Sequence, residues 1–201
     1  MSASQIKSRG LAVESQNTSR LKGNVSHRRL PLAARLKKIR LFLCDVDGVL
    51  TDASVFVGGA REIKQFNIQD GLGLMLLRRA GIKVGWISSR PSRATARRAA
   101  ELKIDFLQQG GAGKVAAIES ILARTRLSWN EVCYVGDDLF DLGALKRAGV
   151  AVAPSNGVAE VKALADYVTR AAGGQGAVRE AAELIVKAQR KWDRLVSDYA
   201  A

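Results

Sequence analysis

From residue 40 onward, short apolar runs alternate with segments in which apolar residues recur at helical spacing. The runs typical of buried strands are LFLCDV (41–46), IKVGWISS (82–89), IDFLQQG (104–110), VCYVGDD (132–138), VAVAP (150–154) and DYVT (166–169). The helical segments are 70–81, 90–103, 113–126, 139–149, 158–165 and 177–199. Strands joined by crossover helices are typical of a parallel sheet covered on both faces. The pattern therefore predicts an α/β fold of the three-layer α/β/α, Rossmann-like type.

One segment alternates with period two on both sides of a glycine pair. SVFVGGAREIKQFN (54–67) turns at Gly58-Gly59, which predicts a β-hairpin flap. In the helical segment that follows, Leu72, Met75 and Leu76 fall on one side. The glycines of AAGGQGA (171–177) do not follow a strand and open a helix as a dinucleotide-binding loop does, so we exclude that motif.

Charge divides the chain into two parts. The net charge is +13, and residues 1–40 hold ten Lys and Arg against one acid, Glu14. We expect residues 1–35 to form a basic, disordered tail and residues 36–201 to form one globular domain. A basic tail can bind nucleic acid. No aromatic interleaving or RNA-binding motif accompanies this charge, so we favour an incidental solvated extension.

The remaining composition points to a cytoplasmic protein. No apolar run is long enough to span a bilayer, and the N-terminus has no signal-peptide core. Cys44 and Cys133 lie in apolar runs and are expected to be buried hydrophobic residues, not a disulfide or a zinc site. His27, the one histidine, has no candidate partner, so a histidine-based hydrolytic mechanism has no support.

Polar residues gather where the predicted strands end. Asp45 ends the first strand, Ser88 the second and Asp137 a later one, and ligands of such sheets bind beyond the carboxyl ends of the strands. Gly48 allows a turn that could bring the carboxylate of Asp45 together with the backbone carbonyl of Asp47. Hard oxygen ligands of this kind suit Mg²⁺.

Four short motifs together resemble the haloacid dehalogenase superfamily of phosphotransferases. They are DVDGVLTD (45–52), the strand that ends in Ser88, Lys114 at the start of a helix, and GDDLFD (136–141). A single acid would be equally typical of a helix N-cap, but the combination in this order is not. A lysine opposes the helix dipole at a helix start, and an anion held between them would remove the conflict.

The resemblance implies a mechanism. Asp45 would attack phosphorus and form an aspartyl-phosphate, while Asp47 would protonate the leaving oxygen and then activate water. Asp45, the carbonyl of Asp47 and Asp137 would hold Mg²⁺, and Asp141 would orient these ligands. Ser88 and Lys114 would bind the transferring phosphoryl group.

The spacing of the motifs also indicates the branch of the superfamily. Residues 52–70 leave room only for the hairpin, and residues 89–114 only for one helix and a short strand, so the chain resembles the capless members. Such members often use a neighbouring subunit as the lid, which implies a homotetramer. The hairpin at 54–66 and the C-terminal helix are the candidate interface elements.

Two longer segments resemble the phosphatases of 3-deoxy-D-manno-octulosonate (KDO) 8-phosphate, which act in lipopolysaccharide biosynthesis, and their sialic-acid-pathway relatives. They are EIKQFNIQDGLG (62–73) and ADYVTRAAGGQGAVRE (165–180). This resemblance implies a Mg²⁺-dependent phosphatase for a sugar-acid phosphate. The implied substrate contacts are Asp47, Asn67, Ile68, Gln69, Asp70, Gly71, Ser88, Arg90, Arg98 and Lys114. For Arg98 a solvated helix face is an equal alternative.

Two positions depart from that pattern. Gln69 and Met75 stand where those phosphatases often have basic residues, which leaves the exact substrate open. A phosphatase of a nine-carbon nonulosonate 9-phosphate is therefore an alternative. A non-catalytic assembly module partnered with a cytidylyltransferase is another, although the intact Asp45, Asp47, Lys114 and Asp137 argue against it.

Overall fold

The computed structural model describes residues 30–56, 62–111 and 113–200. The strands are β1 (Leu41–Cys44), β2 (Lys83–Ser88), β3 (Phe106–Gln109), β4 (Val132–Val135), β5 (Val150–Ala153) and β6 (Tyr167–Val168). The α-helices are α2 (Leu32–Leu36), α3 (Ile68–Arg79), α4 (Arg93–Glu101), α5 (Lys114–Thr125), α6 (Leu142–Arg147), α7 (Ala159–Leu164), α8 (Ala177–Ala188) and α9 (Trp192–Ala200). Short 3₁₀ turns, η1 (Trp129–Glu131) and η2 (Leu139–Asp141), flank β4.

The six strands form one parallel sheet in the order β3-β2-β1-β4-β5-β6. β1 is central and pairs with β2 on one side and with β4 on the other. The strand order reverses between β1 and β4, and this is the place where a doubly wound sheet opens a crevice at its carboxyl edge. The predicted α/β fold with a parallel sheet is confirmed.

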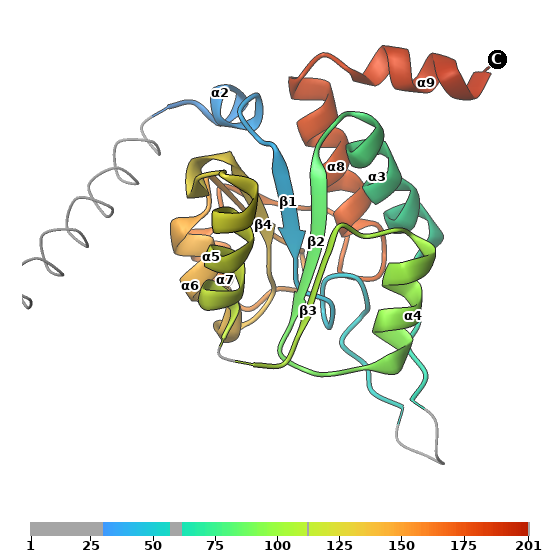
Figure 1. Cartoon of the computed structure of the whole chain (residues 1–201), viewed down its shortest axis with the longest axis vertical. Helices are drawn as coiled ribbons and strands as arrows, with labels where there is room; N and C mark the ends of the chain where they lie inside the picture. Colours follow the sequence, from blue (N-terminus) through green and yellow to red (C-terminus); the bar gives the residue numbers. More distant parts are fainter. Residues whose placement is uncertain (1–29, 57–61, 112, 201) are drawn as a thin grey trace, which may run out of the picture.

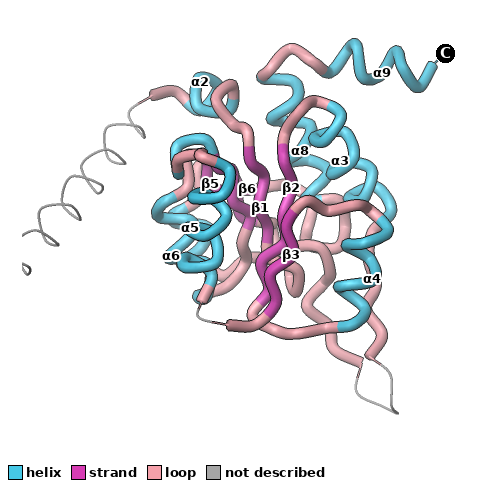
Figure 2. Tube along the Cα trace, in the orientation of Figure 1, coloured by secondary structure: helices cyan, strands magenta, loops and turns pink. Residues whose placement is uncertain are grey.

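Helices cover both faces of the sheet (Figures 1 and 2). Phe42 and Cys44 of β1 face the core beneath α3 and α8, while Leu41 and Leu43 face the core beneath α5, α6 and α7. Both sets are fully buried, so the alternation of side chains continues through a strand with no polar face. This double burial fixes β1, the strand that leads into Asp45.

Helix α2 lies at the predicted domain boundary, residue 36, and packs on the core. Leu36 of α2 is buried in the core, and Arg35 forms two 2.8 Å hydrogen bonds with the carboxylate of Asp166. Residues 1–29, most of the predicted tail, lie outside the described residues. Within the described part of the chain, no helix is long and apolar enough to cross a membrane.

Three local expectations change. The arms of the predicted hairpin, 54–56 and 62–66, contain no strand, and its tip, 57–61, lies outside the described residues. The segment 177–199 is two helices, because Arg190 adopts a φ of 57° that interrupts the helix between α8 and α9. In α3, Leu74 and Leu77 are buried, whereas Met75 faces outward with 38% of its surface exposed.

Candidate active site

The chain turns sharply as it leaves β1. The amide of Asp45 still donates to the carbonyl of Val135 in β4 (3.0 Å), so Asp45 begins in register with the sheet. Gly48 then has a φ of +89°, and a Cβ on it would overlap the carboxylate of Asp137. Only glycine meets both demands without strain. The turn therefore brings the ends of β1 and β4 together.

A buried lysine joins two carboxylates at this point. Lys114, the first residue of α5, places its Nζ 2.7 Å from Oδ2 of Asp45 and 2.6 Å from Oδ1 of Asp141. The side chain of Lys114 is 5% exposed and that of Asp141 is fully buried. A lysine at a helix start is repelled by the positive end of the helix dipole, and the two carboxylates offset this repulsion. Lys114 is held directly beside Asp45, as the predicted roles of the two residues require.

Asp141 is the centre of this arrangement and has no vacant acceptor. Oδ1 accepts from Lys114 Nζ and from the hydroxyl of Tyr134 (2.6 Å each), and Oδ2 accepts from the amides of Asp137 (3.1 Å) and Asp138 (3.3 Å). Four donors use the roughly four lone-pair positions of a carboxylate. Asp141 therefore holds the side chains of Lys114 and Tyr134 and the backbone of residues 137 and 138 in place.

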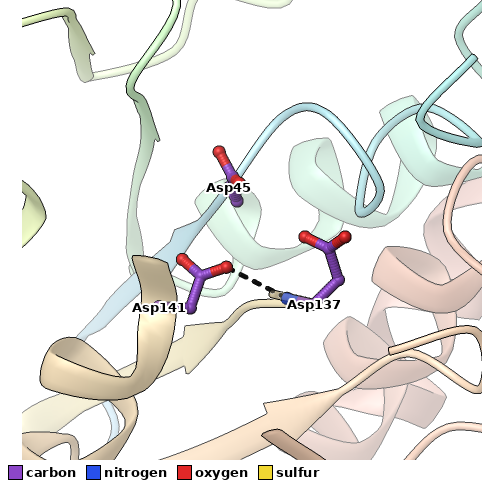
Figure 3. A group of neighbouring side chains, drawn as sticks. All are labelled: Asp45, Asp137 and Asp141. Carbon is purple, nitrogen blue, oxygen red and sulfur yellow. Dashed lines mark hydrogen bonds between the residues drawn. The ribbon is translucent and has the colours of Figure 1, made fainter. Parts of the chain in front are cut away.

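Asp137 and Asp45, by contrast, keep acceptor capacity. Among the described residues, the buried Oδ1 of Asp137 has no hydrogen-bond partner, and the carboxylate of Asp45 accepts only from Lys114 and from the amide of Val46 (2.7 Å). One carboxylate oxygen each from Asp45, Asp137 and Asp141 lie within 4.8 Å of one another (Figure 3). Carboxylate oxygens are ligands that hard divalent cations take. The acceptor capacity left on Asp45 and Asp137 therefore fits such a cation, whereas the acceptors of Asp141 are already used.

The pKa values of the site residues also favour the binding of a cation. Burial, and then the negative charge of Asp141, raises the pKa of Asp45 to about 6. Burial, followed by Asp141 and Asp45, raises the pKa of Asp137 to about 7. Burial alone would lower the pKa of Lys114, but Asp141 and Asp45 outweigh it and raise that pKa. Three carboxylates face one ammonium, so a further cation would offset the excess negative charge.

The carboxylate of Asp47 points to a different set of partners. Nζ of Lys64 donates to its Oδ1 at 2.6 Å, and Nη1 of Arg90 lies 3.9 Å from its Oδ2. Glu62 contacts both cations, at 3.8 Å from Lys64 and 3.5 Å from Arg90. Asp47 is thus held at the rim of the site by the segment 62–64 and by the loop after β2.

Ser88 is the last residue of β2 and directly precedes that loop. Its hydroxyl accepts from the amide of Arg90 and donates to the carbonyl of the same residue, both at 3.1 Å. Gln109 accepts from the amide of Ser92 at 2.7 Å, which ties the loop to the end of β3. Ser88 is buried at the carboxyl end of β2, next to β1, as predicted.

The arrangement matches known proteins in sequence and in structure. The model of the haloacid dehalogenase-like hydrolases matches residues 106–180. The 3-deoxy-D-manno-octulosonate 8-phosphate phosphatase KdsC of Escherichia coli (strain K12) is 39% identical over 161 residues, which cover 80% of this chain and 86% of that protein. This chain is a haloacid dehalogenase-like hydrolase.

Solved structures agree with this assignment to the hydrolase family. The 3-deoxy-D-manno-octulosonate 8-phosphate phosphatase from Moraxella catarrhalis, in complex with magnesium ion, phosphate ion and KDO, is 39% identical with a TM-score of 0.81. The match covers 83% of this chain and 97% of that one. A probable YrbI family phosphatase from Pseudomonas syringae pv. phaseolica 1448a is 40% identical with a TM-score of 0.82, and the match covers 85% and 97%.

Within this hydrolase, the segment NIQDG (67–71) behaves differently from the expectation. Asp70 is 1% exposed, and its carboxylate accepts from the amides of Gly176 (3.2 Å) and Arg179 (2.8 Å) at the start of α8. A carboxylate used in this way caps a helix, so the side chain of Asp70 has a structural role at the start of α8, and its expected substrate contact stays a prediction. Asn67 likewise caps α3, through the amide of Gln69, and reaches the carbonyl of Gly174.

The other members of the segment differ in exposure. Ile68 is 75% exposed, and Gln69 is also exposed, so both are open to a ligand or to another chain. Gly71 is buried, and a Cβ on it would lie 2.8 Å from Nη2 of Arg98. Arg98 is mostly buried and pairs with Glu101 at 2.9 Å, so it is not the solvated residue of the alternative interpretation.

Sequence reasoning missed three residues of this hydrolase site: Lys64, Glu62 and Tyr134. Lys64 and Glu62 lie in EIKQFNIQDGLG, a segment that indicates the family but assigns no role to these two residues. Their i, i+2 spacing would place both on one side of an extended segment, and that was an available signal. Tyr134 had none, because a tyrosine in an apolar strand is typical of a core residue.

Proposed function

We propose that this protein is a Mg²⁺-dependent phosphatase that hydrolyses 3-deoxy-D-manno-octulosonate 8-phosphate to the free sugar acid and phosphate. The protein is a phosphoric monoester hydrolase. The observation that carries the proposal is the placement of Lys114 between Asp45 and Asp141, beside the unpartnered oxygen of Asp137. The identity of about 39% to phosphatases of this substrate supports the choice of substrate.

In the first step, a carboxylate oxygen of Asp45 attacks phosphorus while the bond from phosphorus to the sugar oxygen breaks. Asp47 gives its proton to that oxygen, and the sugar acid leaves as an alcohol. Lys114 and Ser88 bind the transferring phosphoryl group, so that the negative nucleophile can approach an anion. The product on the protein is an aspartyl-phosphate at Asp45.

In the second step, a water molecule attacks phosphorus of the aspartyl-phosphate. Asp47, now a carboxylate, takes a proton from that water, and the bond between phosphorus and the oxygen of Asp45 breaks. Phosphate leaves, Asp45 is again a carboxylate, and Asp47 is again protonated for the next cycle. One residue thus serves both proton transfers.

Mg²⁺ would be held by Asp45, Asp137 and the backbone carbonyl of Asp47, with Asp141 orienting the set. When bound, the ion neutralises negative charge on the phosphoryl oxygens. Two observations support this assignment: the orphaned Oδ1 of Asp137, and the raised pKa values of Asp45 and Asp137, which indicate unbalanced negative charge. The assignment of the Asp47 carbonyl rests on the family resemblance.

The sugar-acid part of the substrate would lie at the rim. Arg90, half-exposed at 49%, is suited to pair with a carboxylate in fork geometry. We also propose substrate contacts for Asn67, Ile68, Gln69, Gly71 and Arg98. Asn67 and Gly71 would use atoms that are not already engaged in helix capping and packing. The exposed Gln69 and Met75 supply no positive charge, so a nine-carbon nonulosonate 9-phosphate is the second candidate substrate.

A substrate panel tests the proposal. The purified protein is assayed for phosphate release from octulosonate 8-phosphate, nonulosonate 9-phosphate and simple sugar phosphates, with Mg²⁺ and with a chelator. We expect Mg²⁺-dependent release that is fastest on octulosonate 8-phosphate. A preference for the nine-carbon substrate would replace the substrate assignment. No release from any of them would favour the non-catalytic assembly module that partners a cytidylyltransferase.

The control for this panel is a pair of aspartate variants. Asp45→Asn should abolish release. Asp52→Asn should not, because the side chain of Asp52 accepts from the amide of Ser54 (2.9 Å) in a turn, a role that an asparagine oxygen can fill. Equal loss in both variants would mean that the assay reports the fold and not the site.

The proposed assembly is a cytoplasmic homotetramer in which a neighbouring subunit covers the site. Exposed apolar side chains near the rim support it, and such groups mark association surfaces. They are Val55, Phe56, Ile63, Ile68, Leu139 and Phe140. Light scattering should give a tetramer, and a monomer at assay concentration would contradict the shared lid.

A further inference from the structure

Lys64 is the one lysine in the described residues that contacts the proposed acid and base. Its side chain is 4% exposed, and its Nζ lies 2.6 Å from Oδ1 of Asp47. Among the described residues, the next anion beside it is Glu62, at 3.8 Å. A buried lysine with one short hydrogen bond to a carboxylate oxygen fixes the direction of that carboxyl group.

The backbone around Lys64 is anchored on both the sheet and the loop before α8. Phe66 stacks on Trp86 of β2 with ring centroids 6.1 Å apart and planes 11° apart. Asn67 caps α3 and donates to the carbonyl of Gly174 (3.4 Å). These contacts hold the irregular segment 62–67 in place, so the ammonium of Lys64 is delivered to Asp47 from a fixed support.

From this geometry, and resting on the proposed function, we propose that Lys64 is the positioning residue of the Asp47 carboxyl group. Lys64 holds Oδ1, so the proton that Asp47 transfers is carried on Oδ2. The proton passes from Oδ2 to the leaving sugar oxygen in the first step, and from water to Oδ2 in the second. Lys64 does not itself bond to the substrate in either step.

A positioning role makes a specific kinetic prediction. Lys64→Met should lower kcat on the sugar-acid phosphate by about 10- to 100-fold, which is part of the contribution of a well-placed general acid and base. KM should stay within about twofold, because the substrate does not contact Lys64. Lys64→Arg should restore much of the rate, since it keeps a cationic donor.

A leaving-group comparison separates positioning from a general structural effect. An aryl phosphate releases a stable phenolate and needs little protonation. With p-nitrophenyl phosphate and Mg²⁺, Lys64→Met should keep a fast burst of p-nitrophenol and then turn over slowly, because only the second step still needs Asp47. A burst slowed as much as sugar-acid turnover would overturn the proposal.

Two further results would also overturn it. The first is a rise in KM at unchanged kcat, which would make Lys64 a substrate contact. The second is an additional loss when Lys64→Met is placed on an Asp47→Asn background, because a residue that acts through Asp47 adds nothing once Asp47 is gone. Lys162→Met, at a lysine that contacts only the carbonyl of Ser155, is the matched control and should retain wild-type kinetics.

Assays of the wild-type protein distinguish a failure of the proposed phosphatase function from a failure of the proposed role of Lys64. Failure of wild-type protein to release phosphate from any substrate rejects the proposed function. Normal wild-type turnover that is unchanged in Lys64→Met rejects only the role of Lys64. Melting temperatures of each variant are measured in parallel, and Lys64→Arg carries the test if Lys64→Met does not fold.

Discussion

The site has a floor and a rim that are built in different ways. We define the floor as Asp45, Lys114, Asp137 and Asp141, and the rim as Asp47, Lys64, Glu62 and Arg90. Floor residues follow β1 and β4 or open α5, and Lys114, Asp45 and Asp141 are joined by ion pairs of 2.7 Å or less. Rim residues lie on turns and irregular segments, and their ion pairs reach 3.9 Å.

The floor lies on strand and helix ends and the rim on irregular segments, and this difference corresponds to the part of the substrate that each would contact. The floor would act on the phosphoryl group, which every substrate of this enzyme class shares, so it can be placed on the rigid ends of central strands. The rim faces the part of the substrate that varies, and irregular segments accommodate change there. We therefore expect floor variants to remove the chemistry on every substrate, variants of Asp47 and Lys64 to slow the proton transfers, and variants of Glu62 and Arg90 to shift rates between substrates.

The largest expected effect comes from Asp45→Asn. Loss of the nucleophile should lower kcat by roughly 10⁴-fold or more on every substrate. Asparagine can still accept from the amide of Val46, so the melting temperature should stay near that of the wild type. Steady-state kinetics and thermal unfolding test this. Substrate-dependent residual activity would break the distinction between floor and rim.

The second effect concerns Lys114→Met. Its removal should lower kcat by about 10²–10³-fold, since one electrostatic donor to the phosphoryl group is lost. It also leaves Asp141 and Asp45 without their shared cation, which should cost about 3–5 kcal/mol of unfolding free energy. Denaturant unfolding, with Lys162→Met as the control, measures the latter. A stable Lys114→Met variant would show that the floor is not held by this ion pair.

Mg²⁺ binding should depend strongly on pH. The pKa values of Asp45 (about 6) and Asp137 (about 7) are raised above the ordinary 3.8, so the folded protein holds protons that the ion must displace. Affinity should rise with pH between 5 and 8, by about tenfold per pH unit for each proton released. Calorimetry in buffers of different ionisation enthalpy counts these protons. A pH-independent affinity would contradict the floor as the ion site.

The metal-free protein should show the opposite trend. A carboxyl group with a raised folded pKa contributes stability below its unfolded pKa, near 3.8, and loses it as the pH rises through the folded value. The wild type should therefore lose stability relative to Asp137→Asn between about pH 4 and pH 7. Unfolding free energies of both proteins, measured with a chelator present, test the sign. A parallel pH dependence in the two proteins would mean that Asp137 is not perturbed.

The smallest loss of activity is expected for Tyr134→Phe, a change behind the floor residue Asp141. The change removes one of the four donors to Asp141, at 2.6 Å, and should cost about 1.5–3 kcal/mol, as for a hydrogen bond to a charged group. The lost donor does not face the phosphoryl position, so turnover should fall less than in Lys114→Met. Equal losses of turnover in the two variants would show that Asp141 controls the site more than Lys114 does.

Much of the floor could be predicted because it follows strand and helix ends. Asp45 and Asp137 each follow a buried apolar run, and Lys114 sits where a helix starts, so topology alone brings them to one edge. Gly48 could be recognised as the turn that joins them. The sheet was predictable for the same reason, since periodicity distinguishes buried strands from amphipathic helices.

The family resemblance indicated Asp47 and Arg90 of the rim, whereas Lys64 and Glu62 could not be predicted from strand and helix ends. Lys64 reaches Asp47 only because Phe66 packs on Trp86, a contact that no local pattern encodes. Asp70 was expected at the substrate, yet its carboxylate caps α8, more than a hundred residues away in sequence. The break between α8 and α9 depends on a positive φ at Arg190, and a non-glycine residue gives no signal for that. In each case the local structure is determined by a long-range contact or by a rare backbone conformation.

The central claim is that the floor forms an aspartyl-phosphate at Asp45 and that Asp47 is needed to resolve it. Asp47→Asn is mixed with p-nitrophenyl phosphate and Mg²⁺, quenched in acid, and its intact mass and phosphorylated residue are determined. We predict one phosphoryl group per chain on Asp45, absent when Asp45→Asn is added, with little further turnover. Undiminished turnover, an unmodified chain, or a phosphoryl group on another residue would contradict the account.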